Sequence, residues 1–562
     1  MGGRAGRVAC LCLVLSLALV PSPAGGMTAL AASIPSPGAV EVTSRDAYRF
    51  QGWGTSLAWW ANVVGGWQSS DQIVDALFGL PDREHPDRLG LNVIRYNIGA
   101  SPVLWCELKD KPEGCAGGLS RDGPFPVADL RRVPACGTFG PGKAIPALAD
   151  AQGARPDIGR DRNQLGVLRA ALSRQSRSSF VLEAFANSPP WWLTVNGCPQ
   201  GNPDLLDAYD NLAAADYGAY ADYLADVLHA FSERGIRFDT LDPLNEPENP
   251  WGQGKDAYIR KLFCTTGCQE GMHFGLEPPR PHTPSLGLLL DDVCGRLGAH
   301  AIGTRVSVPD SSNPTFTSAL LGLTASPPAC VGQINTHMYG PSALTGARQA
   351  LSIEARALSK RIWMSEFGTG GAASDMTSGL TYSSVIAADM RWLRPAAWVN
   401  WQAVEAGGGW GLFEAPTWPR EGPVIRTKRF SALEQYARFI RPGYQVLTTL
   451  DPLDDAAHER TQTMAAIDDL RHPGRIVVVG TNPQVVGRRV VYDLASLGGQ
   501  RLLTTATVTR YRTTAAADME RLGSTPLRAT SLADDQPPGS ITTYVIQLDR
   551  KDSAPARPSA NS

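Results

Sequence analysis

Two glutamates lie at the ends of short apolar runs, where their carboxyl groups could do acid–base chemistry. Glu246 follows residues 240–244, a run of strand character, and stands directly before Pro247. Proline has no N–H for a sheet ladder and restricts the residue before it, so we expect an extended backbone at Glu246. Glu366 follows a second such run, residues 361–364. Glycoside hydrolysis requires one carboxyl group that protonates the leaving oxygen and another that attacks or activates water.

The elements that must position these two glutamates alternate regularly along the chain. Apolar runs of strand character are expected at 50–56, 91–97, 180–185, 240–244, 305–308, 333–337, 361–364 and 397–401. Segments with helical spacing are expected at 71–78, 163–174, 216–234, 286–297, 348–358 and 383–392. Eight strands that alternate with helices predict the α/β class and a (β/α)8 TIM barrel. An open doubly wound sheet is the alternative, but it requires a glycine-rich phosphate turn after the first strand, and none is present.

After a helix expected at 430–439 the pattern becomes all-β. Short runs at 475–480, 485–492, 502–511 and 540–548 are separated by turn residues. They predict a small β-sandwich, to which residues 39–49 are expected to add a strand. The predicted organisation is a signal peptide at 1–32, a linker and strand at 33–48, the catalytic barrel at 49–438, the sandwich at 439–550 and a disordered tail at 551–562.

The N-terminus has the pattern of an export signal. Arg4 and Arg7 precede the apolar run 8–20, and a small-residue site follows at 29–31. This pattern predicts a secreted, extracellular protein. No other apolar run approaches the length of a membrane span, so no membrane association is expected.

The cysteines are consistent with export. Eight remain outside the signal, and in a secreted chain they predict disulfides, including a local bridge among Cys106, Cys115 and Cys136. A zinc site formed by Cys264 and Cys268 with nearby histidines, His273 and His282, is the alternative. Its spacing matches no strong zinc pattern, so we expect no metal.

Charge and aromatic content indicate the type of partner. The formal net charge is −2, and no basic cluster with interleaved aromatic residues is present, which argues against nucleic-acid binding. The 14 tryptophans suit an uncharged, ring-shaped ligand, although a large core accounts for some of them. We therefore expect a monomer that acts on a polysaccharide or oligosaccharide.

Functional groups of a TIM barrel lie at the C-terminal ends of its strands. The substrate-binding candidates at these positions are Asn245, Arg95, Asn97, Trp59, Trp60, Trp192, His337, Tyr339 and Trp401. Arg95 is either a core ion-pair partner or a donor that keeps a nucleophile ionised. His337 is either a core histidine or a hydrogen-bonding group at the rim. Glu183 is expected to be an ion-pair partner, and Trp401 a stacking floor for a sugar.

Several segments together resemble one known family. Residues 51–60, 90–99, 187–192, 245–247 and 363–368 look like glycoside hydrolase family 30, and residues 269–274, 397–402 and 439–443 favour its endo-β-1,6-galactanase branch. The resemblance implies a retaining barrel beside a β-sandwich, without cofactor or metal. It implies that Glu246 is the acid/base, that Glu366 is the nucleophile, and that Asn245 binds the 2-hydroxyl of the sugar. The long insertion at 101–158 departs from the shorter loops of the family.

The resulting expectation is a secreted retaining hydrolase that cleaves β-1,6-galactosidic linkages in the galactan side chains of arabinogalactan by double displacement. The two carboxyl groups should have split pKa values, with the higher value at Glu246. Another specificity within the family, for β-glucosylceramide, β-1,6-glucan or xylan, is the nearer alternative. A non-catalytic carbohydrate-binding barrel is the more distant one.

Overall fold

The computed structural model describes residues 34–35, 38–100, 147–149, 151–195, 199, 210–249, 270–274, 286–322, 327–340, 344–454, 461–471, 473–497, 506–527 and 529–548. Several sequence predictions lie outside these residues: the signal peptide at 1–32, most of the insertion, the cysteines Cys106, Cys115, Cys136, Cys198, Cys264 and Cys268, and the tail at 551–562.

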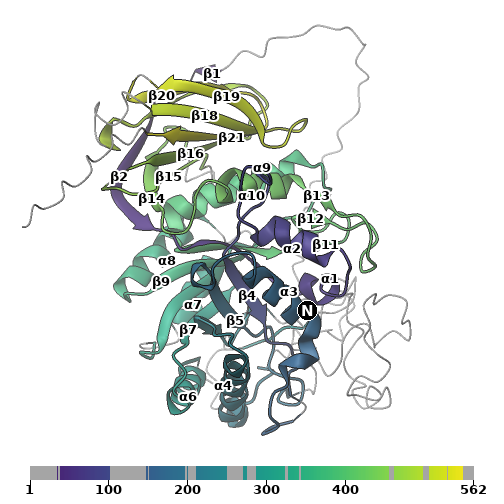
Figure 1. Cartoon of the computed structure of the whole chain (residues 1–562). Coiled ribbons are helices and arrows are strands. Elements are labelled where there is room, and N and C mark those ends of the chain that lie inside the picture. Colours follow the sequence, from purple (N-terminus) through teal and green to yellow (C-terminus); the bar gives the residue numbers. More distant parts are fainter. Residues whose placement is uncertain are drawn as a thin grey trace, which may run out of the picture. The chain divides into compact units, whose positions relative to one another are not determined.

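Eight parallel strands form a closed barrel, which confirms the predicted fold class (Figure 1). Its strands are β3 (Gly52–Ser56), β4 (Val93–Asn97), β5 (Val181–Phe185), β6 (Thr240–Asp242), β7 (Arg305–Ser311), β8 (Val331–His337), β9 (Arg361–Phe367) and β10 (Ala397–Gln402). They neighbour one another in chain order, and β10 closes the barrel by pairing with β3. All eight C-terminal strand ends therefore open onto one mouth.

Two strand ends differ from the prediction and matter for the site. Strand β6 stops at Asp242, because Pro243 has no N–H to continue the ladder. Strand β9 runs on to Phe367, so Glu366 lies inside a paired strand rather than after it. Glu366 is thus held within a strand, whereas Glu246 lies in the turn that follows one.

The described helices are α1 (Trp60–Val64), α2 (Ser70–Phe78), α3 (Arg162–Leu172), α4 (Tyr217–Glu233), α6 (Leu286–Ala299), α7 (Pro314–Leu321), α8 (Thr345–Ala357), α9 (Met376–Ala388) and α10 (Lys428–Ala437). In α4, the residues Tyr220, Leu224, Leu228 and Phe231 recur at helical spacing and are buried. Helices α4 and α6 lie side by side along the barrel (Figure 1).

Helix α7 was not among the predicted helices, although its start is readable in the sequence. Asn313 caps it by accepting hydrogen bonds from the N–H groups of Thr315 and Phe316, and Pro314 occupies the first helical position. Both features are typical of helix starts.

The C-terminal strands form one ten-stranded sheet that includes β2 (Val40–Arg49), as expected for residues 39–49. Its other strands are β1 (Ile34–Pro35), β14 (Gln445–Leu450), β15 (Thr463–Ile467), β16 (Arg475–Asn482), β17 (Arg488–Asp493), β18 (Ala506–Thr513), β19 (Glu520–Leu527), β20 (Ser531–Gln536) and β21 (Ser540–Gln547). Tyr492 of β17 packs against Tyr544 of β21 at 5.2 Å between ring centroids, although these strands are not neighbours. The sheet therefore folds over an internal core, as in a sandwich.

The outer surface of this sheet packs on the last two helices of the barrel. The Ser383 hydroxyl of α9 lies 2.7 Å from the Thr481 hydroxyl of β16, and Gln435 of α10 donates to Thr513 of β18 at 2.8 Å. Lys428 donates to the Thr514 carbonyl at 2.8 Å. The strands after residue 440 thus brace the part of the barrel that carries β9 and β10.

A disulfide joins Cys294 of α6 to Cys330, the residue before β8. Within the described part of the chain, no helix is both long enough and apolar enough to cross a membrane.

Candidate active site

Glu246 and Glu366 both approach the same ring nitrogen of His337 at the mouth of the barrel. The His337 Nδ1 atom is 2.8 Å from Glu246 Oε1 and 3.5 Å from Glu366 Oε1. One oxygen of each glutamate and one ring nitrogen of His337 all lie within 4.8 Å of one another. Glutamates from β9 and from the turn after β6 are thus brought across a gap of the size at which two carboxyl groups can act on one glycosidic bond.

The backbone of Glu246 differs from the prediction. We expected an extended residue before Pro247, but the φ angle of Glu246 is 43°, in the left-handed region. The N–H of Glu246 donates to the carbonyl oxygen of Asp310 at 2.9 Å, which ties this turn to the end of β7. A contact across the barrel overrides the local preference.

Arg95 contacts three carboxylates from three different strands. Its Nε donates to Glu183 at 2.9 Å, its Nη1 donates to Glu366 Oε2 at 3.2 Å, and its Nη2 is paired with Asp310. Arg95 is therefore a buried ion-pair partner, and it is also a donor to Glu366. Glu183 is the expected ion-pair partner.

The pKa of Glu366 reflects a competition between burial and these cations. Burial raises it from its usual 4.5 to about 7, although His337 and Arg95 act to lower it. The charges of Glu246 and Asp310 add to the increase. This differs from the low pKa expected for the nucleophile of a split pair, because desolvation of a side chain that is 5% exposed outweighs the two cations.

His337 and Asp310 form a charged pair beneath the two glutamates. Burial alone would lower the pKa of His337, but the charges of Glu366 and Asp310 raise it well above 6.5. Burial would raise the pKa of Asp310, but Arg95 and His337 hold it at about 2. The imidazolium nitrogen Nε2 lies 3.0 Å from Asp310 Oδ1. His337 is therefore hydrogen-bonded to Glu246 through Nδ1 and paired with Asp310 through Nε2.

This protonation state bears on metal binding. Glu246, His337 and Glu366 are near enough to share one cation. A histidine ligates a metal through a neutral ring nitrogen, however, and His337 has its pKa raised by the surrounding carboxylates. The geometry and charge favour hydrogen bonding within this cluster over ligation.

Asp310 and Asp242 were not among the predicted site residues. Asp310 lies two residues beyond the predicted end of its strand, so no pattern in the sequence marks it as part of the mouth. Asp242 accepts a hydrogen bond from Asn335 at 2.7 Å, and burial together with Asp310 and Glu183 raises its pKa well above 3.8. Their partners lie on other strands, and only barrel closure brings them together.

One wall of the mouth combines aromatic and amide groups around Glu270. Glu270 is buried and accepts hydrogen bonds from Trp59 Nε1 at 2.9 Å, from Asn97 Nδ2 and, at 3.4 Å, from Asn187 Nδ2. Trp59 packs edge-on against Trp401, with 5.0 Å between ring centroids. The structure thus brings together Trp59, Asn97 and Trp401, three of the residues named from the sequence, and Glu270, which was not predicted, joins them.

Tyr339 lies on the other side of His337, with 5.8 Å between ring centroids. Burial and the charges of Glu366 and Glu246 raise the pKa of Tyr339 well above 10, so its hydroxyl stays protonated. Tyr339 also packs against Trp410 at 5.4 Å. Trp410 was not predicted as a site residue, although the glycine run 407–409 before it marks an unusual loop.

Two predicted substrate-binding residues are placed elsewhere. Trp60 is fully buried in the core between barrel and helices, and its Nε1 donates to the Ser56 carbonyl at 2.7 Å. Because α1 begins at Trp60, its side chain turns away from that of Trp59. Trp192 packs edge-on against Tyr223 of α4 and donates to the Ala149 carbonyl at 3.2 Å, rather than joining the two glutamates.

The chain is similar to known carbohydrate-active proteins. The model of the family described as O-Glycosyl hydrolase family 30 matches residues 149–260. An endo-β-1,6-galactanase from Hypocrea rufa is 30% identical over 410 residues, covering 72% of this chain and 74% of the relative. An exo-β-1,6-galactobiohydrolase from Bifidobacterium longum subsp. longum is 24% identical over 440 residues, covering 65% of this chain and 27% of that longer relative.

Solved structures share the fold at much lower identity. The crystal structure of a conserved exported protein from Bacteroides fragilis has a TM-score of 0.69 at 16% identity and covers 90% of this chain and 100% of its own. Together with the galactanase relative and the matching family model, the sequence and its fold identify the protein: it is an O-glycosyl hydrolase that belongs to glycoside hydrolase family 30.

Proposed function

We propose that this hydrolase cleaves β-1,6-galactosidic linkages in the galactan side chains of arabinogalactan, with retention of anomeric configuration. The observation that carries the proposal is the pair Glu246 and Glu366, which both lie next to His337 Nδ1 and have their nearest oxygens inside 4.8 Å of each other. Retaining glycosidases have their two carboxyl groups about 5–5.5 Å apart, and inverting enzymes about 6.5–9.5 Å apart. The names of both sequence relatives refer to β-1,6-linked galactose, which supports this linkage.

In the proposed mechanism, Glu366 attacks the anomeric carbon while Glu246 gives its proton to the departing glycosidic oxygen. The bond between that carbon and the oxygen breaks, and a glycosyl ester forms on Glu366. Glu246 then takes a proton from water, the hydroxide attacks the anomeric carbon, and the ester bond to Glu366 breaks. Each step conserves protons, because Glu246 donates one and later recovers one.

The neighbouring groups support these roles. Arg95 and His337 place positive charge beside Glu366, which favours its ionised, nucleophilic form. Asn245 stands next to Glu246, and its buried Oδ1 has no hydrogen-bond donor among the residues that the structure describes. A sugar 2-hydroxyl would satisfy this oxygen.

The protein is also proposed to be exported and monomeric. Arg4, Arg7 and the apolar run 8–20 support export, as does the fold shared with a protein named as exported. N-terminal sequencing of protein from culture medium should show that the leader has been removed. Light scattering after gel filtration should give the mass of one chain.

A substrate panel tests the activity. Purified protein is incubated with dearabinosylated arabinogalactan, β-1,6-glucan, xylan and β-glucosylceramide, and the released sugars are measured. Galactan should be the preferred substrate, NMR should show the β-anomer first, and product sizes will separate endo from exo cleavage. E366Q and E246Q should lose almost all turnover and keep the wild-type circular dichroism spectrum. Preference for another substrate on the panel would replace the galactan assignment, and near-normal activity of E366Q would refute the mechanism.

A further inference from the structure

Trp410 is an exposed tryptophan at the mouth of the barrel. It lies in the loop between β11 (Val404–Glu405) and β12 (Phe413–Glu414), which follows the last barrel strand. Its side chain is 40% exposed, whereas Trp59 and Trp401 nearby are 4% and 8% exposed. The exposed part of its indole is an apolar surface that a ligand in the mouth can cover.

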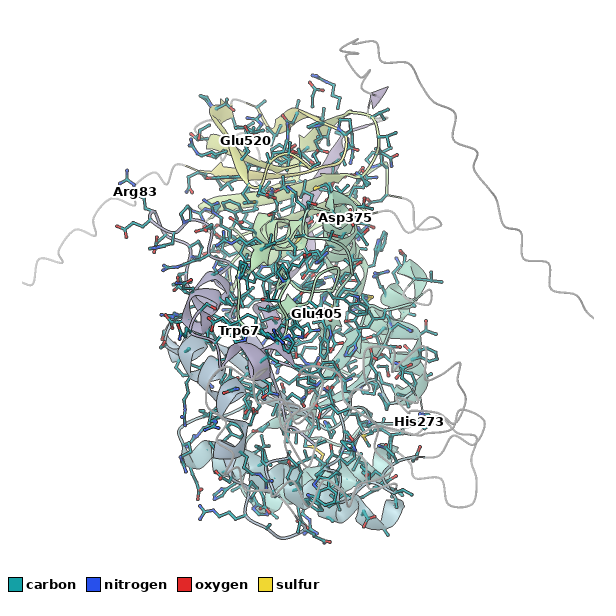
Figure 2. The ribbon with its side chains drawn as sticks, turned by 90° about the vertical axis from the view of Figure 1, so that its right-hand side faces the viewer. Trp67, Arg83, His273, Asp375, Glu405 and Glu520 are labelled. Carbon is teal, nitrogen blue, oxygen red and sulfur yellow. A yellow bond between two sulfur atoms is a disulfide. The ribbon has the colours of Figure 1, made fainter. Side chains whose placement is uncertain are left out.

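The loop holds Trp410 in place from both sides. Its backbone N–H donates to Glu405 Oε2 at 2.7 Å, and Glu405 is labelled in Figure 2. Arg429 of α10, which is 1% exposed, donates to the carbonyl oxygens of Gly409 and Gly411, each at 3.1 Å. The same guanidinium donates to the Gly371 carbonyl at 3.0 Å. One buried cation therefore fixes both residues that flank Trp410 and links them to the segment after β9.

The indole lies against two glycines, Gly368 and Gly370. A Cβ atom added to Gly368 would lie 3.2 Å from Trp410 Cε3, and one added to Gly370 would lie 3.2 Å from Trp410 Cδ1 and Nε1. Gly368 directly follows Glu366 and Phe367 along the chain, and Gly370 comes two residues later. The indole of Trp410 thus packs on the segment that continues strand β9, which carries the proposed nucleophile Glu366.

The remaining neighbour of the ring connects it with the catalytic cluster. Trp410 packs on Tyr339 with 5.4 Å between centroids, and Tyr339 packs on His337. One aromatic ring, that of Tyr339, therefore separates Trp410 from the histidine that both glutamates approach. The exposed part of the indole is the part of this aromatic series that a ligand in the mouth can cover.

We propose that Trp410 is a binding platform on which a pyranose ring adjoining the cleaved sugar stacks. One face of a galactopyranose presents C–H groups, and an aromatic face is its apolar counterpart. The indole is fixed in place, exposed, and packed on the segment that follows Glu366. It is therefore suited to bind the sugar next to the cleaved one in a glycan chain, and Trp410 should favour polymeric substrates. This assignment rests on the proposed function, because it requires a glycan chain in the same mouth.

Kinetics of W410A, W410F and I353A on β-1,6-galactan test the proposal. Ile353 is an exposed apolar residue, 61% accessible, on the helix α8. W410A should raise KM at least tenfold while kcat falls less than threefold, and W410F should give an intermediate KM because a smaller ring remains. I353A should match the wild type. Thermal unfolding of each variant checks that the loop change leaves the fold intact.

Binding without turnover provides a second measurement. Calorimetric titration of E366Q and of E366Q combined with W410A with a β-1,6-linked galactooligosaccharide should show at least tenfold weaker binding without the indole. An unchanged KM and an unchanged Kd, or a loss in kcat alone, would overturn the platform and leave Trp410 as a loop-packing residue. If the wild type instead cleaves another glycan of the panel, the proposed specificity fails, and the same comparison on that glycan decides the role of Trp410.

Discussion

The N–H of Glu246 donates to the carbonyl oxygen of Asp310 at 2.9 Å, and both residues have left-handed backbones, with φ angles of 43° and 57°. The Asp310 side chain pairs with Arg95 and His337, and it accepts from the Ser365 hydroxyl at 2.6 Å. Asp310 thus holds Glu246 through its backbone and the surroundings of Glu366 through its side chain. It is therefore a positioning residue for both glutamates.

Replacing Asp310 should therefore disturb both glutamates together. In D310N the amide cannot accept from all three donors, so Arg95 and His337 should shift relative to Glu366. Displacements on the order of 1 Å can cost roughly 100-fold in rate, and we expect a fall of about that size in kcat/KM. D389N is the matched control, because Asp389 is equally buried but binds Arg348 and Trp398 elsewhere. D389N should lose stability and keep its kcat/KM at 25 °C, and equal rate losses in both variants would contradict a positioning role.

The charge of His337 should set the acidic limb of the pH profile. Glu366 must be ionised to attack, and its pKa of about 7 predicts that kcat/KM rises as pH passes through 7. The His337 charge lowers that pKa, so H337Q should move the limb upward, by roughly one pH unit. The measurement is kcat/KM between pH 4 and 9. H85Q, which changes an exposed histidine, should leave the limb in place. A downward shift in H337Q would refute this electrostatic role.

Glu366 should make the protein less stable at alkaline pH. Its pKa is raised from 4.5 in the unfolded chain to about 7 in the folded protein, so the folded state binds this proton more tightly. The resulting stabilisation is complete below about pH 4.5 and is lost as pH rises through 7. Glutamine has no such proton, so E366Q should be more stable than the wild type at pH 8, on the order of 1–3 kcal/mol.

Urea unfolding at pH 5 and pH 8 measures this difference. The advantage of E366Q should be larger at pH 8 than at pH 5, while E84Q, at an exposed glutamate, should show none. An advantage of E366Q that is the same at both pH values would mean that it does not come from the proton of Glu366.

Glu270 should affect substrate binding through the residues that it orients. In E270Q, the Oε1 atom to which Trp59, Asn97 and Asn187 all donate becomes a neutral amide oxygen, which is a weaker acceptor than a carboxylate oxygen. The wall formed by these residues should loosen, and we expect kcat/KM to fall, roughly tenfold, mainly through KM. Initial-rate kinetics on galactan provide the measurement. E233Q, which removes a surface partner of Arg155, is the control and should behave as the wild type. A loss in kcat alone would place Glu270 among the groups that act on the reacting bond.

The sequence by itself determined the repeating strand–helix order and the two glutamates at strand ends. Apolar runs and helical spacing are local patterns, and the positions of Glu246 and Glu366 after such runs follow from the same patterns. Barrel topology then requires that both residues reach the same mouth. The resemblance of several segments to one family pointed to the same pair.

Only the tertiary structure decided which neighbours surround that pair. Asp310 has no local pattern to mark it, and Glu270 lies in the family-like segment 269–274 without any sign of its role, because each acts on residues from other strands and loops. Trp59 and Trp60 are adjacent in sequence, yet one reaches the mouth and the other the core, since a helix begins between them. Trp410 is a platform candidate only because residues of other elements hold its ring beside Tyr339. These residues are Arg429 of α10 and the two glycines Gly368 and Gly370 after β9. Burial and charge at one point depend on every element that closes around it, and this dependence is not visible in any single stretch of residues.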